Sequence, residues 1–166
     1  PQKLRRLNLM CSHVDNEGIP ALAQVRNLEK VELLGAAIGD GALVHLKNVK
    51  SLRRVGLYGR PITDAGAKHL AELPNLENLG LGDTQVGDGT VRALVTHENL
   101  QHLDLGGTEV TDAGLDSLKQ FPSLKWVSLT DTEVTQHAVD RLKKARPDLK
   151  VMWSPPDDGL PLPFPE

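Results

Sequence analysis

The sequence predicts an α/β solenoid, in which short parallel strands line a concave face and short helices cover the convex face. Two observations support this prediction. A leucine recurs every 24 residues, at Leu4, Leu28, Leu52, Leu76, Leu100 and Leu124, and Leu149 follows after 25. Within each unit the apolar period changes from two to three, as expected where a strand precedes a helix. We expect six full 24-residue repeats, stacked in a horseshoe arc, and a partial repeat from residue 149.

The strand of each unit lies in its first positions, counted from the opening leucine. Position four is Leu or Val, and position six is always Leu. The leucines at position six are Leu9, Leu33, Leu57, Leu81, Leu105 and Leu129. This alternation with polar residues is typical of a short, half-buried strand. A β-branched residue at position eleven, such as Ile62 or Val110, is expected to anchor the turn that leaves the strand.

The helix of each unit follows this turn. Apolar residues three apart, such as Leu115 and Leu118, recur at the same place in other units and indicate one face of a short helix. Side-chain oxygens that can cap free backbone N–H groups come just before these segments. They belong to Asp15, Thr63, Thr111 and Thr135. Aspartates at the next position, where negative charge is favoured, are Asp40, Asp64, Asp88 and Asp112.

The composition argues against binding to nucleic acid or to a membrane surface. Aromatic residues make up only 3% of the chain, so the core must be aliphatic, and a platform of aromatic side chains for nucleic acid is not expected. The net charge of −3 gives no general attraction to nucleic acid or anionic membranes. Residues 1–60 hold ten basic and five acidic residues, whereas residues 61–166 hold nine and seventeen. Since sequence order is spatial order in a solenoid, we expect a basic end and an acidic end.

Location is indicated by the single cysteine and by the lack of targeting signals. One cysteine, Cys11, excludes an internal disulfide and favours a reducing compartment. No apolar run approaches the roughly 18 residues of a membrane span, and no signal peptide is visible. These features favour the cytoplasm. The chain begins with Pro1 and enters the repeat pattern at once, so we expect it to be a piece of a longer protein.

The repeated phrase L-x-x-L-x-L-x-x-T-x-V-T-D-x-G-L-x-x-L resembles leucine-rich repeat proteins over about residues 4–152. Blocks such as "VTDAGL" look most like the cysteine-containing subclass and the long arrays of some bacterial proteins. The chain departs from that subclass at position nine, which is never cysteine and is threonine in Thr84, Thr108 and Thr132. We expect these hydroxyls to bond to the backbone of the turn. The resemblance implies a binding surface, and a fold alone does not name a function.

A partner is expected on the concave face, to which the odd positions of each strand point. Met10, Leu34 and Tyr58 should form an apolar column there, with Arg6, Lys30 and Arg54 as a basic column beside it. Glycines such as Gly56 and Gly80 should leave the middle of the face bare. An apolar strip with a charged rim is typical of an interface. The predicted contact residues are Arg6, Met10, Lys30, Leu34, Arg54, Tyr58, His102, Asp104 and Trp126.

Other interpretations of these residues stay open. Met10 and Leu34 also suit a role as cover for the edge of an array, and Trp126 suits packing against the C-terminal segment. The favoured function is a non-catalytic scaffold for a protein or peptide, not for nucleic acid or membrane. The alternatives are a substrate-selecting or regulatory domain of a larger enzyme, such as a ubiquitin-ligase-type adaptor, and an array that self-associates end to end through its uncapped N-terminal edge.

Sequence motifs for catalysis, metals or cofactors are not recognised. The six histidines form no metal-spaced pair and are expected on the surface. Cys11 and His13 lack a third group that would orient them as nucleophile and base. The glycine-rich "GLGDTQVGDG" is in phase with the repeat and lacks the lysine of a phosphate-binding loop. We therefore predict no catalytic residue, no metal and no cofactor.

The C-terminal end divides into a last strand and a tail. The segment "LKVMW" is expected to be that strand, with Trp153 shielding the end of the core. The solenoid is thus assigned to residues 1–152. Residues 153–166 are assigned to a proline-rich tail or linker, with a docking peptide as the alternative. Within this tail Leu160, Leu162 and Phe164 are expected to pack on something.

Overall fold

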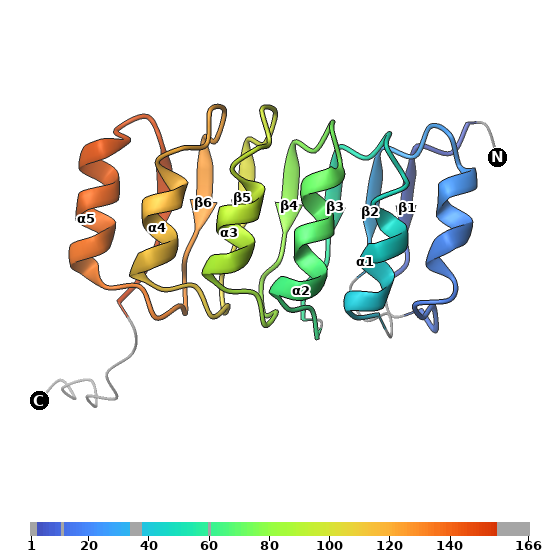
Figure 1. The fold of residues 1–166 in the computed structure, drawn as a ribbon, viewed down its shortest axis with the longest axis horizontal. Coiled ribbons are helices and arrows are strands. Elements are labelled where there is room, and N and C mark those ends of the chain that lie inside the picture. The colour runs from blue at the N-terminus through green and yellow to red at the C-terminus, as the bar shows by residue number, and fades with distance from the viewer. Residues whose placement is uncertain (1–2, 11, 34–37, 60, 156–166) are drawn as a thin grey trace, which may run out of the picture.

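The computed structural model describes residues 3–10, 12–33, 38–59 and 61–155. Seven parallel strands form one open sheet, in which each strand lies beside the next one along the chain (Figure 1). They are β1 (Arg6–Asn8), β2 (Lys30–Glu32), β3 (Arg54–Gly56), β4 (Asn78–Gly80), β5 (His102–Asp104), β6 (Trp126–Ser128) and β7 (Lys150–Met152). Equivalent residues of neighbouring units stand opposite each other, as Lys30 does with Arg6 and Arg54. The predicted α/β solenoid is confirmed.

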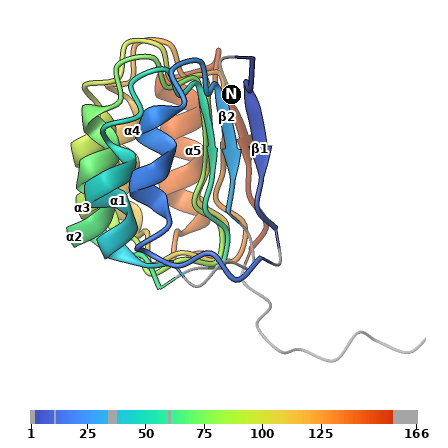
Figure 2. The ribbon, with the colours of Figure 1, turned by 90° about the vertical axis from the view of Figure 1, so that its right-hand side faces the viewer.

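The helical segments cover one face of this sheet and leave the other uncovered, and we call the uncovered side the open face (Figure 2). Five segments are α-helical and two are 3₁₀ helices. They are η1 (Ile19–Gln24), α1 (Asp40–Leu46), α2 (Asp64–Ala67), η2 (Lys68–Glu72), α3 (Asp88–Leu94), α4 (Asp112–Leu118) and α5 (Gln136–Ala145). None of the helices within the described ranges is long and apolar enough to cross a membrane.

The predicted helix caps are confirmed at the threonines but wrong at Asp15. Thr63, Thr111 and Thr135 each accept a hydrogen bond from a backbone N–H in the first turn of the helix that follows. Asp15 instead accepts from the backbone N–H groups of Glu17 and Gly18. It therefore closes a turn that precedes η1. The sequence Asp-Asn-Glu-Gly inserts this turn before η1 begins at Ile19.

The core lies between the sheet and the helices and is aliphatic, as the composition predicts. The leucines at position six from Leu33 to Leu129 are fully buried, and each contributes roughly 1.5–3 kcal/mol by leaving water. The first unit is different. Leu4 is 38% exposed, and Leu7 and Leu9 are only partly buried. The packing is therefore complete along the array and thin at its N-terminal edge.

The aspartates at the helix starts link successive units, a role that the sequence analysis missed. The Asp88 carboxylate accepts hydrogen bonds from the Thr111 backbone N–H at 2.9 Å and from its hydroxyl at 2.7 Å. Asp40 and Asp112 hold Thr63 and Thr135 in the same way. Asp64 instead accepts from the backbone N–H groups of Gly87 and Thr90 and from the Thr90 hydroxyl. We call these contacts the aspartate rungs.

The turns after β3, β4, β5 and β6 use a left-handed backbone at position eight. The φ angles there are 62° at Gly59, 58° at Asp83, 64° at Gly107 and 54° at Asp131. The next residue in the later units is a buried threonine whose hydroxyl donates to the carbonyl three residues back. These bonds run from Thr84, Thr108 and Thr132 to Leu81, Leu105 and Leu129, at 2.6–2.7 Å. The predicted role of the threonine hydroxyls is confirmed.

The C-terminal end of the array is closed by two side chains. The Trp153 indole N–H donates to the Val134 carbonyl at 3.1 Å, and its ring packs on the core. Arg146 donates to the carbonyls of Phe121 and Leu124, each at 2.9 Å, and forms an ion pair with Asp148. The predicted shielding by Trp153 is confirmed. Residues 156–166, and with them Leu160, Leu162 and Phe164, lie outside the described residues, as does Cys11.

The last strand keeps the 24-residue register although the last leucine does not. Lys150 begins β7 and stands opposite Trp126, which is 24 residues earlier. Leu149 comes 25 residues after Leu124 because Asp148 occupies the expected leucine position. Asp148 pairs with Arg146, and Leu149 packs into the core in its place. The altered spacing thus accommodates the closing ion pair.

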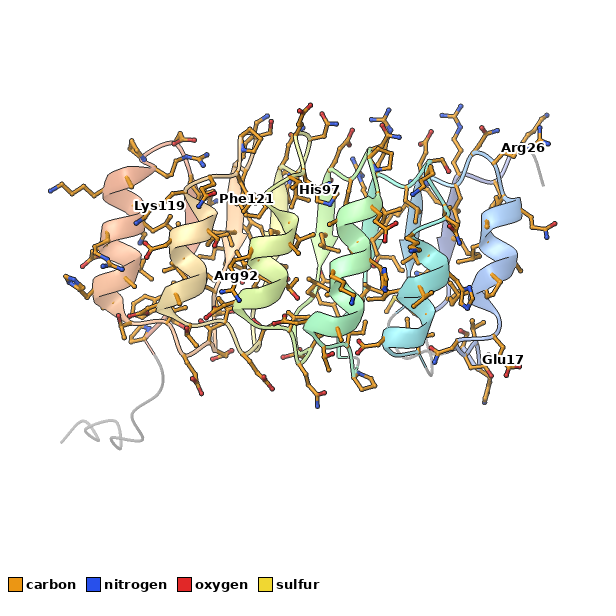
Figure 3. All side chains as sticks on the ribbon, viewed as in Figure 1. Glu17, Arg26, Arg92, His97, Lys119 and Phe121 are labelled. Atoms are coloured by element: carbon orange, nitrogen blue, oxygen red, sulfur yellow. The ribbon has the colours of Figure 1, made fainter. Side chains whose placement is uncertain are left out.

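One histidine contradicts the expectation that all six lie on the surface. His97 is only 4% exposed, and its Nε2 donates to the Leu70 carbonyl at 3.1 Å (Figure 3). It occupies the position that holds Leu73 and Phe121 in the neighbouring units. Burial is the main cause that lowers the pKa of His97. The imidazole is therefore neutral in the folded protein at neutral pH.

Candidate functional site

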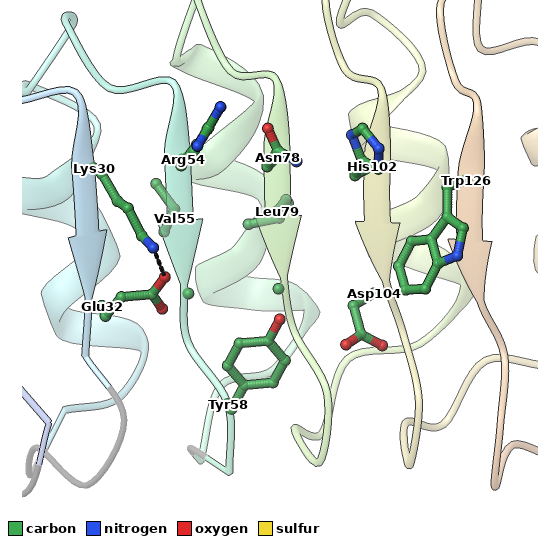
Figure 4. A pocket seen from close by; sticks show the side chains of 12 residues that line it. Lys30, Glu32, Arg54, Val55, Tyr58, Asn78, Leu79, His102, Asp104 and Trp126 are labelled. Carbon is green, nitrogen blue, oxygen red and sulfur yellow. Dashed lines mark ion pairs between the residues drawn. The ribbon is translucent and has the colours of Figure 1, made fainter. Parts of the chain in front are cut away.

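The open face carries a groove of about 550 Å³ that crosses the strands from β2 to β6 (Figure 4). Its residues stand in two rows, because positions three and five of a strand point to the same face. The row at the strand starts is Lys30, Arg54, Asn78, His102 and Trp126. The row at the strand ends is Glu32, Gly56, Gly80 and Asp104, and Tyr58, Val55 and Leu79 complete the lining.

Tyr58 forms one wall of the groove and leans from the end of β3 over β4. A Cβ placed on Gly80 would lie only 2.3 Å from the Tyr58 hydroxyl and from its Cζ. One placed on Gly82 would lie 3.1 Å from Cδ1 of the same ring. The expectation that these glycines leave the face bare is therefore wrong. They make room for an aromatic ring that lies directly on the backbone of the next strand.

The Tyr58 hydroxyl is fixed in its protonated form. Burial raises the pKa of Tyr58 to about 12, and the negative charges of Asp104 and Glu32 add to the effect. The hydroxyl also donates a hydrogen bond to the Asp104 carboxylate. Because a phenol with this pKa stays protonated at neutral pH, Tyr58 acts here as a rigid donor and an apolar surface.

Charges in the groove are only partly balanced. Lys30 Nζ lies 3.0 Å from Glu32 Oε1, so these two side chains neutralise each other. Asp104 accepts from the Gly106 backbone N–H at 3.1 Å and from Tyr58, and no cation pairs with it among the described residues. Arg54 has neither a hydrogen bond nor an ion pair from its guanidinium to any residue that the structure describes. Among the described residues, the Arg54 cation on β3 and the Asp104 carboxylate on β5 thus lack an oppositely charged partner.

Trp126 and His102 form the aromatic end of the groove. Their ring centroids are 6.4 Å apart, and the planes are tilted by 39°. The alternative interpretation of Trp126 was packing against the C-terminal segment. Within the described ranges its ring contact is with His102, and Trp153 covers the end of the array instead. The indole of Trp126 therefore remains half-buried and faces the groove beside Asp104 (Figure 4).

Six of the nine predicted contact residues line this one groove, namely Lys30, Arg54, Tyr58, His102, Asp104 and Trp126. Arg6 stands opposite Lys30 on β1 and does not line the groove, and Met10 follows β1 with 47% of its surface exposed. Leu34 lies outside the described residues, so the apolar column through it stays a prediction. Glu32 and Asn78 were missed as contact residues, although their positions in the repeat place them in the two rows.

The groove offers hydrogen-bond donors, a carboxylate and two aromatic surfaces. Such groups hold and orient a ligand. Across the described part of the chain, no three His, Cys, Asp or Glu side chains come together as metal ligands would. The donors, the carboxylate and the aromatic surfaces together suit recognition by charge and shape.

Comparisons with known proteins agree with this architecture. A family model described as Leucine Rich repeat matches residues 1–23 and 96–119. A crystal structure of an internalin from Listeria monocytogenes is similar, with a TM-score of 0.67 and 17% sequence identity. The match covers 93% of this chain and 50% of that one, so this chain spans half the length of the internalin. No curated protein matches. At this identity the likeness concerns the fold alone.

Proposed function

We propose that this chain, which resembles leucine-rich repeat proteins in its repeat sequence and its fold, is a non-catalytic interaction scaffold that binds a protein or peptide on the open face of its sheet. The groove across β2 to β6 carries the proposal. Its volume of about 550 Å³ lies in the range of roughly 300–1,000 Å³ that is usual for ligand sites.

The residue types in the groove support binding to a protein. Tyrosine, tryptophan and arginine are the side chains that most often dominate binding energy at interfaces. Tyr58, Trp126 and Arg54 stand at three places around this groove. Tyr58 is already held by Asp104 and by the strand beneath it, so little side-chain freedom is lost when a partner binds. A preformed surface of this kind favours recognition of a partner.

The experiment compares the open face with the helical face. The wild-type chain, an Arg54→Glu/Trp126→Ala variant and an Arg92→Glu/Lys119→Ala variant are used to capture proteins from source-cell lysate. Arg92 and Lys119 lie on the helical side (Figure 3), and both variants make the chain more acidic, so a loss of binding caused by net charge alone would appear in both. We expect the wild type and the helical-face variant to retain a common partner that the open-face variant loses at least tenfold.

Folding and direct contact must be checked before this result is interpreted. All three chains should show the same thermal unfolding, since the changed side chains are outside the core. The partner, once named, should bind the purified wild-type chain in solution. Loss of the partner in the helical-face variant, with retention in the open-face variant, would place the binding surface on the helices and refute the proposal.

A second candidate function, end-to-end self-association, rests on the N-terminal edge. Leu4 is 38% exposed, and β1 pairs with β2 on one side and with no other strand among the described residues. Exposed strand edges with apolar side chains tend to pair with another chain. Sedimentation velocity over a hundredfold concentration range should then show growing species that a Leu4→Glu variant lacks. A constant monomer for the wild type rejects this candidate.

A further inference from the structure

We propose that the groove selects an extended peptide that carries an acidic side chain and, four residues along, a basic one. This inference rests on the proposed function, because it names the chemistry of the partner of the same open face. The peptide runs along the array, across the strands, with its acidic side chain on Arg54 and its basic side chain between Trp126 and Asp104 (Figure 4).

The acidic side chain of the peptide is inferred from the Arg54 guanidinium, which has no partner among the described residues. Arg54 is exposed on β3, and its side chain meets no acceptor in the described part of the molecule. The neighbouring Lys30 is already neutralised by Glu32. A guanidinium binds a carboxylate through two parallel hydrogen bonds, which are stronger than bonds between neutral groups. Arg54 therefore binds the carboxylate of the peptide.

The basic side chain of the peptide is inferred from the residues at the β5–β6 end of the groove. Asp104 lines the groove without a cation, and the Trp126 indole lies beside it. A cation over an indole face gains attraction from the ring, and a lysine or arginine stem packs on the ring as an apolar surface. A carboxylate next to that ring then receives the charged head group. The pair selects a long basic side chain over an apolar one, because an apolar side chain would leave Asp104 covered and unpaired.

The spacing follows from strand geometry. Arg54 and Trp126 occupy the same position on β3 and β6, which are three strands apart. At about 4.8 Å between strands, this separation is roughly 14 Å. An extended peptide advances about 3.4 Å per residue, so four residues also span roughly 14 Å. The side-chain period of two places both charged residues on the side that faces the groove.

A helix or a nucleic acid suits this groove less well. An α-helix needs about nine residues to span the same roughly 14 Å, so a four-residue spacing of the two charges is specific to an extended peptide. A nucleic acid would place phosphates along the whole row, and the Asp104 carboxylate would repel those near it. Between the two ends, Asn78 and His102 face the middle of the peptide, where their polar groups can bond to its backbone.

The test is a selection from a phage-displayed library of random dodecapeptides against the wild-type chain. We expect enriched sequences with Asp or Glu four residues from Arg or Lys. Synthetic versions should bind at least tenfold more weakly to Arg54→Glu and to Trp126→Ala, as measured by fluorescence anisotropy. Selection against Arg54→Glu should replace the acidic residue of the pair with a basic one. An Arg92→Glu chain should select the same sequences as the wild type.

Each other outcome overturns the inference and separates it from the proposed function. Enriched peptides that lack the charge pair but still need Trp126 refute the peptide chemistry and keep the open face as the binding surface. Enriched peptides that are indifferent to both groove variants refute both proposals. If nothing is enriched, an isolated extended peptide is not the ligand, and the lysate comparison then decides whether the open face binds a folded protein.

Discussion

The two ends of the array face the same problem, which is the exposed side of a stacked aliphatic core. At the C-terminal end, Trp153 lies on the core and Arg146 bonds to two carbonyls of the preceding unit. The longest helix, α5, also stands there. At the N-terminal end the helical segment is a 3₁₀ helix, and the apolar side chains Leu4, Leu7 and Leu9 remain accessible.

The difference shows which features close a repeat array. The position-six leucines keep the same 24-residue spacing from Leu9 to Leu129, so this spacing alone does not complete the packing. Closure at the C-terminal end comes from side chains that occur once, outside the repeated phrase, and that satisfy carbonyls and cover apolar surface together. Stability should therefore be unequal along the chain, with local opening easiest at β1 and hardest toward β6.

The largest effect is expected when leucine at position six is truncated at each end of the array. Leu129→Ala removes a fully buried side chain next to the closed end and should lower the free energy of unfolding by about 3 kcal/mol. Leu9→Ala makes the same change where the side chain is only partly buried and should cost about 1 kcal/mol. Urea denaturation followed by circular dichroism measures both. Equal losses would mean that the two ends are packed alike.

A smaller effect is expected at Arg146, which bonds to two carbonyls at the C-terminal end of the array. Arg146→Ala removes two bonds to carbonyls and the ion pair with Asp148, and it should cost about 2 kcal/mol. Hydrogen exchange should show faster opening at α5 and β7 and unchanged exchange at β2. Arg146→Lys keeps the charge but loses the forked geometry, so most of the loss should remain. A fully stable lysine variant would show that charge, not the paired carbonyl bonds, closes this end.

An acid-dependent effect is expected between the two ends, at His97. Its pKa in the folded chain is lowered by burial, so the unfolded chain binds a proton more readily than the folded one. The contribution of His97 to stability should thus be constant above about pH 6.5 and fall below it, by at most about 1.4 kcal/mol per pH unit. His97→Leu, which copies Leu73 of the preceding unit, should remove this dependence. The pH series of unfolding curves would contradict the assignment if both chains lost stability equally.

The smallest effect on the free energy of unfolding is expected at Gly59, where backbone strain can be separated from packing. A Cβ on Gly59 would meet no atom within 4 Å, yet its φ of 62° is costly for alanine. Gly59→Ala should therefore cost about 1 kcal/mol, through the backbone alone. Gly59→Asp should cost less, because Asp83 and Asp131 hold this turn in the later units. If alanine proves neutral in thermal unfolding, the turn in the N-terminal half is looser than its equivalents toward the closed end.

The repeat predicts the fold well because equivalent positions of successive units hold the same type of residue. The register that aligns Lys30 with Arg54 follows from the 24-residue period, so the basic part of the groove could be placed from the sequence. The burial of His97 also had a signal, since its equivalents are Leu73 and Phe121. The residue type alone suggests a surface histidine, whereas its place in the repeat indicates a buried one.

Contacts between neighbouring units depend on the direction of individual side chains, which the repeat pattern does not specify. The lean of Tyr58 over Gly80 crosses from one strand to the next, and only the three-dimensional path of the side chain shows it. The reach of Asp88 to Thr111 likewise joins two units. A helix-start aspartate looks the same in sequence whether it serves its own helix or the next one. The depth of the groove follows from such contacts and was not predictable.

The aspartate rungs have one further consequence, which concerns the order of events during synthesis. Each carboxylate belongs to the unit nearer the N-terminus, and each helix start that it receives belongs to the unit after it. Because a ribosome delivers the chain from its N-terminus, Asp88 has left the ribosome before Thr111. Each unit from the third to the sixth is therefore synthesised after the carboxylate that binds its helix start, and the array can grow by adding one unit at a time to a folded neighbour.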